Sequence, residues 1–105
     1  MIDLIGCSDG SITNCKLTGN SETTCISIQL AENINIANNF IDTCNIGIQI
    51  TDTPNRRDID VILGNVINAT IPIYVNYVND IKVCDNIIAN NIVEERAVNI
   101  VKVNN

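Results

Sequence analysis

Apolar and polar residues alternate in short pieces along the whole chain. The piece at residues 26–30, Ile-Ser-Ile-Gln-Leu, returns at residues 46–50 as Ile-Gly-Ile-Gln-Ile, and Ile-Asn-Ile lies between them at residues 34–36. Alternation with a period of two is typical of β-strands that bury one face. The high β-branched content and an asparagine every few positions oppose helices. The pattern therefore predicts an all-β chain of short strands.

The pieces form three series that recur in a fixed order. The first series comprises residues 2–4, 26–28, 46–48, 71–73 and 98–100. The second comprises residues 11–12, 34–36, 59–61 and 81–83, and the third comprises residues 16–17, 40–41, 66–67 and 87–88. Copies of a series lie roughly 20 to 27 residues apart, which predicts about four coils of three short strands each.

This period predicts a solenoid in which equivalent strands of successive coils stack at ~4.8 Å. In the first series we expect Ile28 to stack on Ile48 and Ile48 on Ile73. Before the third-series strands stand Asn39, Asn65 and Asn86, with Cys15 in the first copy. We expect these asparagines to form a ladder of side-chain amides from coil to coil. Asparagine also suits the corners, because it tolerates the left-handed backbone region.

The stretches NINIANNFIDTCNIGIQI and DIKVCDNIIANNI resemble the right-handed parallel β-helix repeats of the pectate-lyase-like superfamily. The resemblance covers essentially the whole chain and implies an all-β, right-handed parallel β-helix. Residues 1–105 would then form a single segment of a longer solenoid or of an oligomer. Known members include pectate and pectin lyases, polygalacturonases, alginate epimerases and phage tailspikes, so the resemblance implies a carbohydrate partner without specifying an activity.

The charge and composition exclude several classes of function. The chain has 6 basic and 12 acidic residues, a net charge of −6 and no histidine. Scattered basic residues cannot neutralise phosphates, so we expect no nucleic-acid partner and no anionic membrane surface. No apolar run approaches membrane-spanning length. Without histidine, the chain lacks His-based catalysis and His-ligated metals, and it cannot complete the polygalacturonase or epimerase patterns.

Two rows of outward side chains are expected on the coils. Gln29, Gln49 and Tyr74 would form one vertical row, in which amides beside an aromatic ring suit sugar hydroxyls and a sugar face. The alternative is that polar residues merely cover a solvated sheet. A second row would contain Ser11, Asn35, Asp60 and Lys82, and would let Asp60 pair with Lys82.

The longest break between coils, residues 51–60, concentrates charged residues. It contains Arg56, Arg57, Asp58 and Asp60. A guanidinium can bind the carboxylate of an acidic sugar through two hydrogen bonds. The resemblance implies more for a lyase: an arginine or lysine that abstracts a proton, and acidic residues that hold calcium. No family catalytic motif surrounds these residues, so a solvated loop is the alternative. Calcium enters only with the lyase, and otherwise we expect no metal and no cofactor.

The five cysteines form no C-x-x-C pair, which disfavours zinc and thioredoxin-like sites. We expect free, mostly buried thiols that act as small core residues. Cys25 with Cys44, and Cys15 with Cys84, fall near corresponding places in the repeat, and we expect them to stack. Oxidation of one pair is the alternative.

These observations favour a non-catalytic solenoid segment with a carbohydrate-binding or assembly surface, similar to a tailspike shaft. One alternative is a fragment of a polysaccharide lyase or glycosidase acting on an acidic glycan through residues 56–60. Another is a purely structural oligomer, in which the Gln29, Gln49 and Tyr74 row is an interface. The sequence does not assign a location. We expect no signal peptide in this chain, and a tailspike-like role would place it in a virion or outside the cell.

Overall fold

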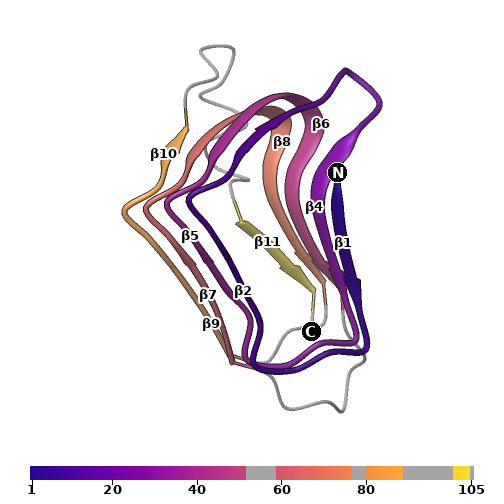
Figure 1. The fold of residues 1–105 in the computed structure, drawn as a ribbon, viewed down its shortest axis with the longest axis vertical. Coiled ribbons are helices and arrows are strands. Elements are labelled where there is room, and N and C mark those ends of the chain that lie inside the picture. Colours follow the sequence, from indigo (N-terminus) through magenta and orange to yellow (C-terminus); the bar gives the residue numbers. More distant parts are fainter. Residues whose placement is uncertain (52–58, 77–79, 89–100, 105) are drawn as a thin grey trace.

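The chain folds into a solenoid of parallel β-strands. A computed structural model describes residues 1–51, 59–76, 80–88 and 101–104, and this part contains strands and no helix (Figure 1). The strands are β1 (Ile2–Ile5), β2 (Ser11–Thr13), β3 (Lys16–Thr18), β4 (Thr24–Gln29), β5 (Asn35–Ala37), β6 (Phe40–Thr51), β7 (Ile59–Leu63), β8 (Val66–Asn76), β9 (Asp80–Cys84), β10 (Ile87–Ile88) and β11 (Val101–Asn104). The predicted all-β solenoid is confirmed.

Equivalent strands of successive turns pair in parallel and build two sheets. The larger sheet has the order β1-β4-β6-β8-β10, with β3 paired to β6 and β11 paired to β8, and the smaller has the order β2-β5-β7-β9. In Figure 1 the smaller sheet lies on the left, and β1, β4, β6 and β8 lie on the right. Ile2 pairs with Ile26, Ile26 with Ile48 and Ile48 with Ile73. These pairings define about three turns, where the sequence pattern predicts about four coils.

Two strands are longer than the sequence pattern predicts, because third-series and first-series pieces run together. β3 pairs with the start of β6, and β4 pairs with its end. The pairing of β6 with β8 shifts in register between Asp42 and Cys44, where Thr43 has a φ of 58°. An irregularity of this kind bends a strand. β6 therefore continues from one turn into the next as a single strand.

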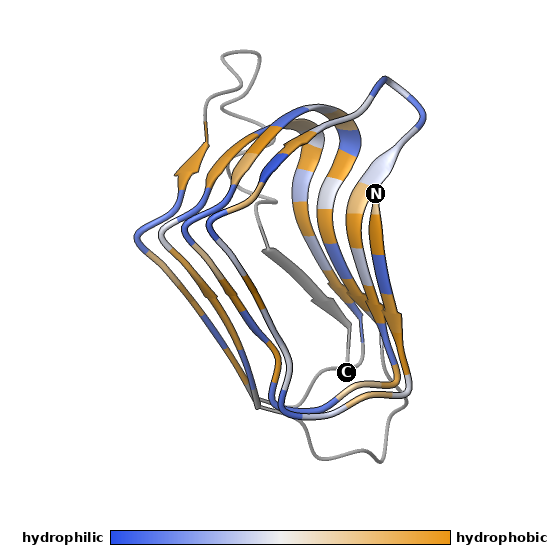
Figure 2. Ribbon diagram, in the orientation of Figure 1, coloured by the Kyte–Doolittle hydropathy of each residue, from blue (hydrophilic) through white to orange (hydrophobic). Residues whose placement is uncertain are grey.

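The core consists of isoleucine side chains stacked from turn to turn. The fully buried large side chains are Ile26, Ile28, Ile34, Ile36, Ile41, Ile48, Ile50, Ile62, Ile67, Ile73 and Val75. Figure 2 shows the resulting alternation of hydrophobic and hydrophilic positions along the strands. Burial of this apolar surface is the main stabilising contribution. As expected from a composition with few aromatic residues, the core is built from aliphatic side chains.

The observed registers confirm part of the predicted stacking and correct the rest. All third-series pairings are confirmed: Lys16 pairs with Phe40, Phe40 with Val66 and Val66 with Ile87. The stacking of Ile48 on Ile73 is also confirmed. The predicted stacking of Ile28 on Ile48 is wrong, because Ile48 pairs with Ile26, and Ile28 pairs with Ile50. A shift of two residues leaves every side chain on the same face, so the apolar pattern does not distinguish these registers.

The predicted asparagine ladder is confirmed. The side-chain Oδ1 of Asn39 accepts the Cys15 N–H, that of Asn65 accepts the Asn39 N–H, and that of Asn86 accepts the Asn65 N–H, each at 2.9 Å. The ladder positions are 24, 26 and 21 residues apart along the chain. The residue before each ladder position has a left-handed backbone, with φ of 56° at Asn14, 58° at Asn38, 68° at Gly64 and 56° at Asp85. One corner geometry thus recurs in each turn.

Candidate functional site

The first predicted ligand row lies on the outer face of the larger sheet, with a corrected register. Gln49 pairs directly with Tyr74, so these two side chains are neighbours on adjacent turns. Gln29 pairs with Thr51, two positions further along the strand, and Ser27 stands beside Gln49. The predicted row of Gln29, Gln49 and Tyr74 is therefore wrong at Gln29. The observed row runs Asp3, Ser27, Gln49 and Tyr74.

The side chains of this row differ in accessibility: Asp3 is exposed, and Ser27 is buried. Gln49 and Tyr74 are half-buried, while Gln29 is exposed. Half-burial restricts the rotamers of a side chain, so less conformational entropy is lost when it binds a ligand. The accessible members of the row present a carboxylate, an amide and a phenol, which together donate and accept hydrogen bonds. This arrangement can bind a polyhydroxylated ligand without covalent chemistry.

Asp60 does not occupy the position that the sequence predicts. It is fully buried, and its Oδ1 accepts the Ile34 N–H at 2.9 Å. Val61, not Asp60, lies in the row of Asn35 and Lys82. The predicted row is therefore wrong at Asp60, which pairs in register with Ile81 and does not stand beside Lys82. From inside the solenoid, the Asp60 carboxylate holds the backbone of the preceding turn just before β5 begins.

The remaining residues predicted for the charged loop cannot be placed. Arg56, Arg57 and Asp58 lie outside the described residues. Within the described part of the chain, no group of three or more Cys, Asp or Glu side chains is arranged to hold a metal ion. Among the same residues, no helix is long and apolar enough to cross a membrane.

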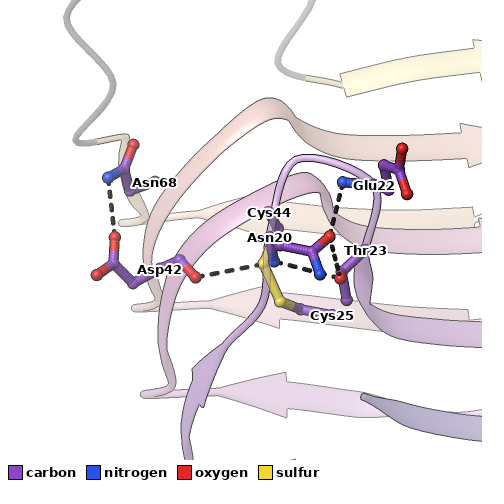
Figure 3. The surroundings of a disulfide bond; sticks show 7 residues. All are labelled: Asn20, Glu22, Thr23, Cys25, Asp42, Cys44 and Asn68. Atoms are coloured by element: carbon purple, nitrogen blue, oxygen red, sulfur yellow. Dashed lines mark hydrogen bonds between the residues drawn. A yellow bond between two sulfur atoms is a disulfide. The ribbon is translucent and has the colours of Figure 1, made fainter.

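A second outward patch on β3, β6 and β8 was missed by the sequence reasoning. Phe40 is 45% exposed, and the Lys16 Nζ lies 5.8 Å from the centre of its ring. Two residues along β6, the Asp42 Oδ1 accepts a hydrogen bond from the Asn68 Nδ2 at 2.9 Å (Figure 3). Phe40 precedes the buried Ile41, so strict alternation along the third series would have placed it outward.

The expectation of free, stacked thiols is wrong for Cys25 and Cys44, which form a disulfide between β4 and β6. Cys7, Cys15 and Cys84 are free and half-buried. Cys15 and Cys84 do not stack on each other, because Cys15 occupies the ladder position while Cys84 pairs with Leu63. Beside the disulfide, the Asn20 Oδ1 accepts the Glu22 N–H and the Thr23 hydroxyl, both at 2.9 Å (Figure 3). The turn that leads into β4 is thus ordered next to the covalent link.

Comparison with known proteins adds no relative: no family model, no curated protein and no solved structure matches the chain.

Proposed function

We propose that the chain is a non-catalytic β-solenoid segment whose outer sheet face binds a glycan. The observation that carries this proposal is the direct pairing of Gln49 with Tyr74 on adjacent turns. Neighbouring strands lie ~4.8 Å apart, so an amide and an aromatic ring stand within reach of one sugar unit. The ring offers an apolar face to the sugar, and the amide offers both a donor and an acceptor to its hydroxyls.

The charge of the chain favours a neutral glycan over an acidic one. With a net charge of −6, the chain repels polyanions at long range. The row itself contains an exposed carboxylate, Asp3. Lys102 follows Tyr74 in backbone register, so the strand order gives the row an acidic residue at one end and a basic residue at the other.

The finer classification as a pectate-lyase-like β-helix, similar to a tailspike shaft, belongs to the same proposal. It is supported by parallel strands stacked in turns, by an isoleucine core and by the asparagine ladder. The burial of Asp60 favours a binding segment over the lyase alternative, because that carboxylate faces the interior and holds a backbone N–H.

The test is binding of neutral and acidic polysaccharides to the chain and to three variants. We expect a neutral glycan to bind, and Tyr74→Ala to weaken its affinity about tenfold, which corresponds to ~1.4 kcal/mol. Gln49→Ala should also weaken it. Gln29→Ala is the matched control, because Gln29 is an equally polar residue of the same sheet but lies in the next row. Calorimetric titration, with circular dichroism to verify folding, gives the comparison. The proposal fails if no glycan binds, or if Gln29→Ala and Tyr74→Ala lose the same affinity.

Side-by-side assembly is a second candidate, favoured by exposed apolar side chains at the start of β6 and of β10. Phe40 and Ile87, which flank Val66 in register, are 45% and 62% exposed. We expect the mass measured by light scattering to rise with concentration, and Phe40→Ser with Ile87→Ser to reverse that rise. A concentration-independent monomer would exclude this candidate.

A further inference from the structure

The asparagine ladder is directional. At each of its three interfaces, the asparagine of the later turn completes the corner of the earlier turn. Its Oδ1 accepts the N–H of the preceding ladder residue at 2.9 Å. Its Nδ2 donates to the carbonyl three residues before that ladder residue, at 3.0 Å for Ile12, 3.0 Å for Ile36 and 3.1 Å for Ile62. Each corner is thus half of a site, and the next turn supplies the asparagine that fills it.

The last described corner, at Asp85 and Asn86, has the backbone groups that accept an asparagine side chain in the earlier corners. Asp85 has the same left-handed backbone as Asn38, with φ of 56° against 58°, and Asn86 occupies the ladder position. The equivalent polar groups are the Val83 carbonyl and the Asn86 N–H, which we call the corner socket. No described residue fills the corner socket with a side-chain amide.

The apolar residues beside the corner socket are also less covered than their equivalents in earlier turns. Ile62 and Ile67 are fully buried, whereas Val83 and Ile88, which pair with them, are only partly buried. β10 pairs with the N-terminal half of β8, and β11 pairs with its C-terminal half. In each earlier turn the strand of the larger sheet comes first, and the strand of the smaller sheet follows it. β11 is therefore the first strand of the next turn, and a strand placed on β9 and β10 would be the continuation of that turn.

We propose that the edge of β9 and β10 is a docking surface for an extended segment with an asparagine at its corner. Such a segment has the order apolar, polar, apolar, any residue, a left-handed residue, asparagine, any residue and an apolar residue, as at residues 34–41. It would add as parallel strands, in which backbone hydrogen bonds provide affinity and side-chain contacts provide specificity. The asparagine would accept the Asn86 N–H and donate to the Val83 carbonyl, as in the three earlier turns. The fitting partner is a solenoid turn of this type from another polypeptide.

A second copy of this chain, stacked end to end, fits the corner socket less well. Its first turn carries Cys15 at the ladder position. A thiol is a weak donor and a weak acceptor. The Cys15 Sγ also donates to the Thr13 carbonyl of its own turn at 3.4 Å. Cys15 thus ends the ladder on the first-turn side and disfavours head-to-tail stacking.

The test adds three labelled peptides to the full chain. The first has the sequence of residues 33–42, which contains a complete corner; the second carries Asn39→Ala, and the third carries Asn35→Ala. Asn35 is exposed in the folded chain and serves as the matched control. We expect the first peptide to bind, Asn39→Ala to bind about tenfold more weakly, and Asn35→Ala to bind within about twofold of the first. NMR shifts should appear at Val83 and Asn86. Equal affinity of all three peptides, no binding at millimolar peptide, or shifts at residues 11–18 instead would overturn the proposal.

A full-length variant tests the second-copy argument separately. Cys15→Asn supplies the missing amide, so we expect its mass in light scattering to rise with concentration above that of Cys15→Ser. An unchanged mass for Cys15→Asn would contradict the assigned role of the ladder asparagine in docking.

Discussion

At the scale of single residues, the most consequential side chains are buried amides rather than charged groups. Asn65 is fully buried and uses both ends of its amide. Its Oδ1 accepts the N–H and the Nδ2 of Asn39, and its Nδ2 donates to the Ile36 carbonyl and to the Asn86 Oδ1. The ladder therefore satisfies backbone groups at the corner that strand pairing leaves unpaired.

Replacing Asn65 tests this role. Asn65→Ala leaves the Asn39 N–H and the Ile36 carbonyl without their hydrogen-bond partner. Each buried polar group left unsatisfied costs ~1–3 kcal/mol, so we expect the free energy of unfolding to fall by about 3 kcal/mol. Urea denaturation gives the value. The control is Asn35→Ala, an exposed asparagine whose loss should have little effect. Equal stability of the two variants would refute the structural role of the ladder.

The ladder could be predicted from the sequence, whereas the burial of Asp60 could not. Asn39, Asn65 and Asn86 each precede a third-series strand, so their common position follows from the repeat alone. The stretch Ile-Asp-Val-Ile-Leu at residues 59–63 has apolar residues in both phases, and either phase is compatible with a strand. A shift of one residue exchanges the inner and outer faces, and the observed pairing of Ile36 with Ile62 turns Asp60 inward.

At the scale of strands, β6 requires a glycine at residue 47, where it passes close to β8. A Cβ at Gly47 would lie 2.6 Å from the Ile67 Cγ2 and 2.6 Å from the Pro72 carbonyl oxygen. The second contact is with backbone and cannot be relieved by a rotamer change. We expect Gly47→Ala to destabilise the fold by ~1–3 kcal/mol.

Gly10→Ala is the matched control for Gly47→Ala. Its added Cβ would meet the Ile34 Cδ1 at 3.3 Å, the far end of a flexible side chain. Thermal unfolding of both variants, followed by circular dichroism, should separate them clearly. A Gly47→Ala variant as stable as Gly10→Ala would show that β6 and β8 are further apart than described.

The link between β4 and β6 is covalent as well as hydrogen-bonded. The disulfide joins residues 19 apart in sequence. It closes a loop in the unfolded chain and thereby lowers the conformational entropy of the unfolded state. For a loop of this length the stabilisation is about 3 kcal/mol. The double replacement Cys25→Ala with Cys44→Ala should lower the urea midpoint accordingly, whereas Cys84→Ala, at a free thiol, should change it much less. Thiol titration of the unfolded, unreduced protein should detect three thiols, and a count of five would contradict the link.

The sequence could not specify this link or the pairing of β4 with β6. Alternating isoleucines at residues 46, 48 and 50 allow several registers that differ by two and bury the same face. The observed register depends on the irregularity between Asp42 and Cys44, which adds a left-handed residue at Thr43. Threonine is not a residue that signals such a backbone. The third series, by contrast, was predicted in full, because each strand begins directly after a ladder position.

At the scale of the whole molecule, a solenoid is stabilised by contacts between neighbouring turns, so stability should vary along its axis. In such folds each unit contacts only its neighbours, and the terminal units have one neighbour instead of two. The burial of the core follows this expectation. Ile36 and Ile62 of the inner strands are fully buried, whereas Leu4 at one end and Val83 at the other are partly buried.

Hydrogen exchange measures this gradient directly. We expect the slowest backbone amides in β5, β6 and β7. Exchange should be faster in β2 and β3 and in β9 and β10, because local opening needs less free energy where a described turn packs on only one side. The Asn65→Ala variant should accelerate exchange mainly in β5 and β7, whose corners meet at that amide. A common exchange rate in all turns would instead mean that the chain opens only as a unit, and the independent end turn that the docking proposal requires would not exist. Adding the peptide of residues 33–42 should slow exchange in β9 and β10 and so reduce the gradient at that end. This result would place the bound peptide at the edge of β9 and β10.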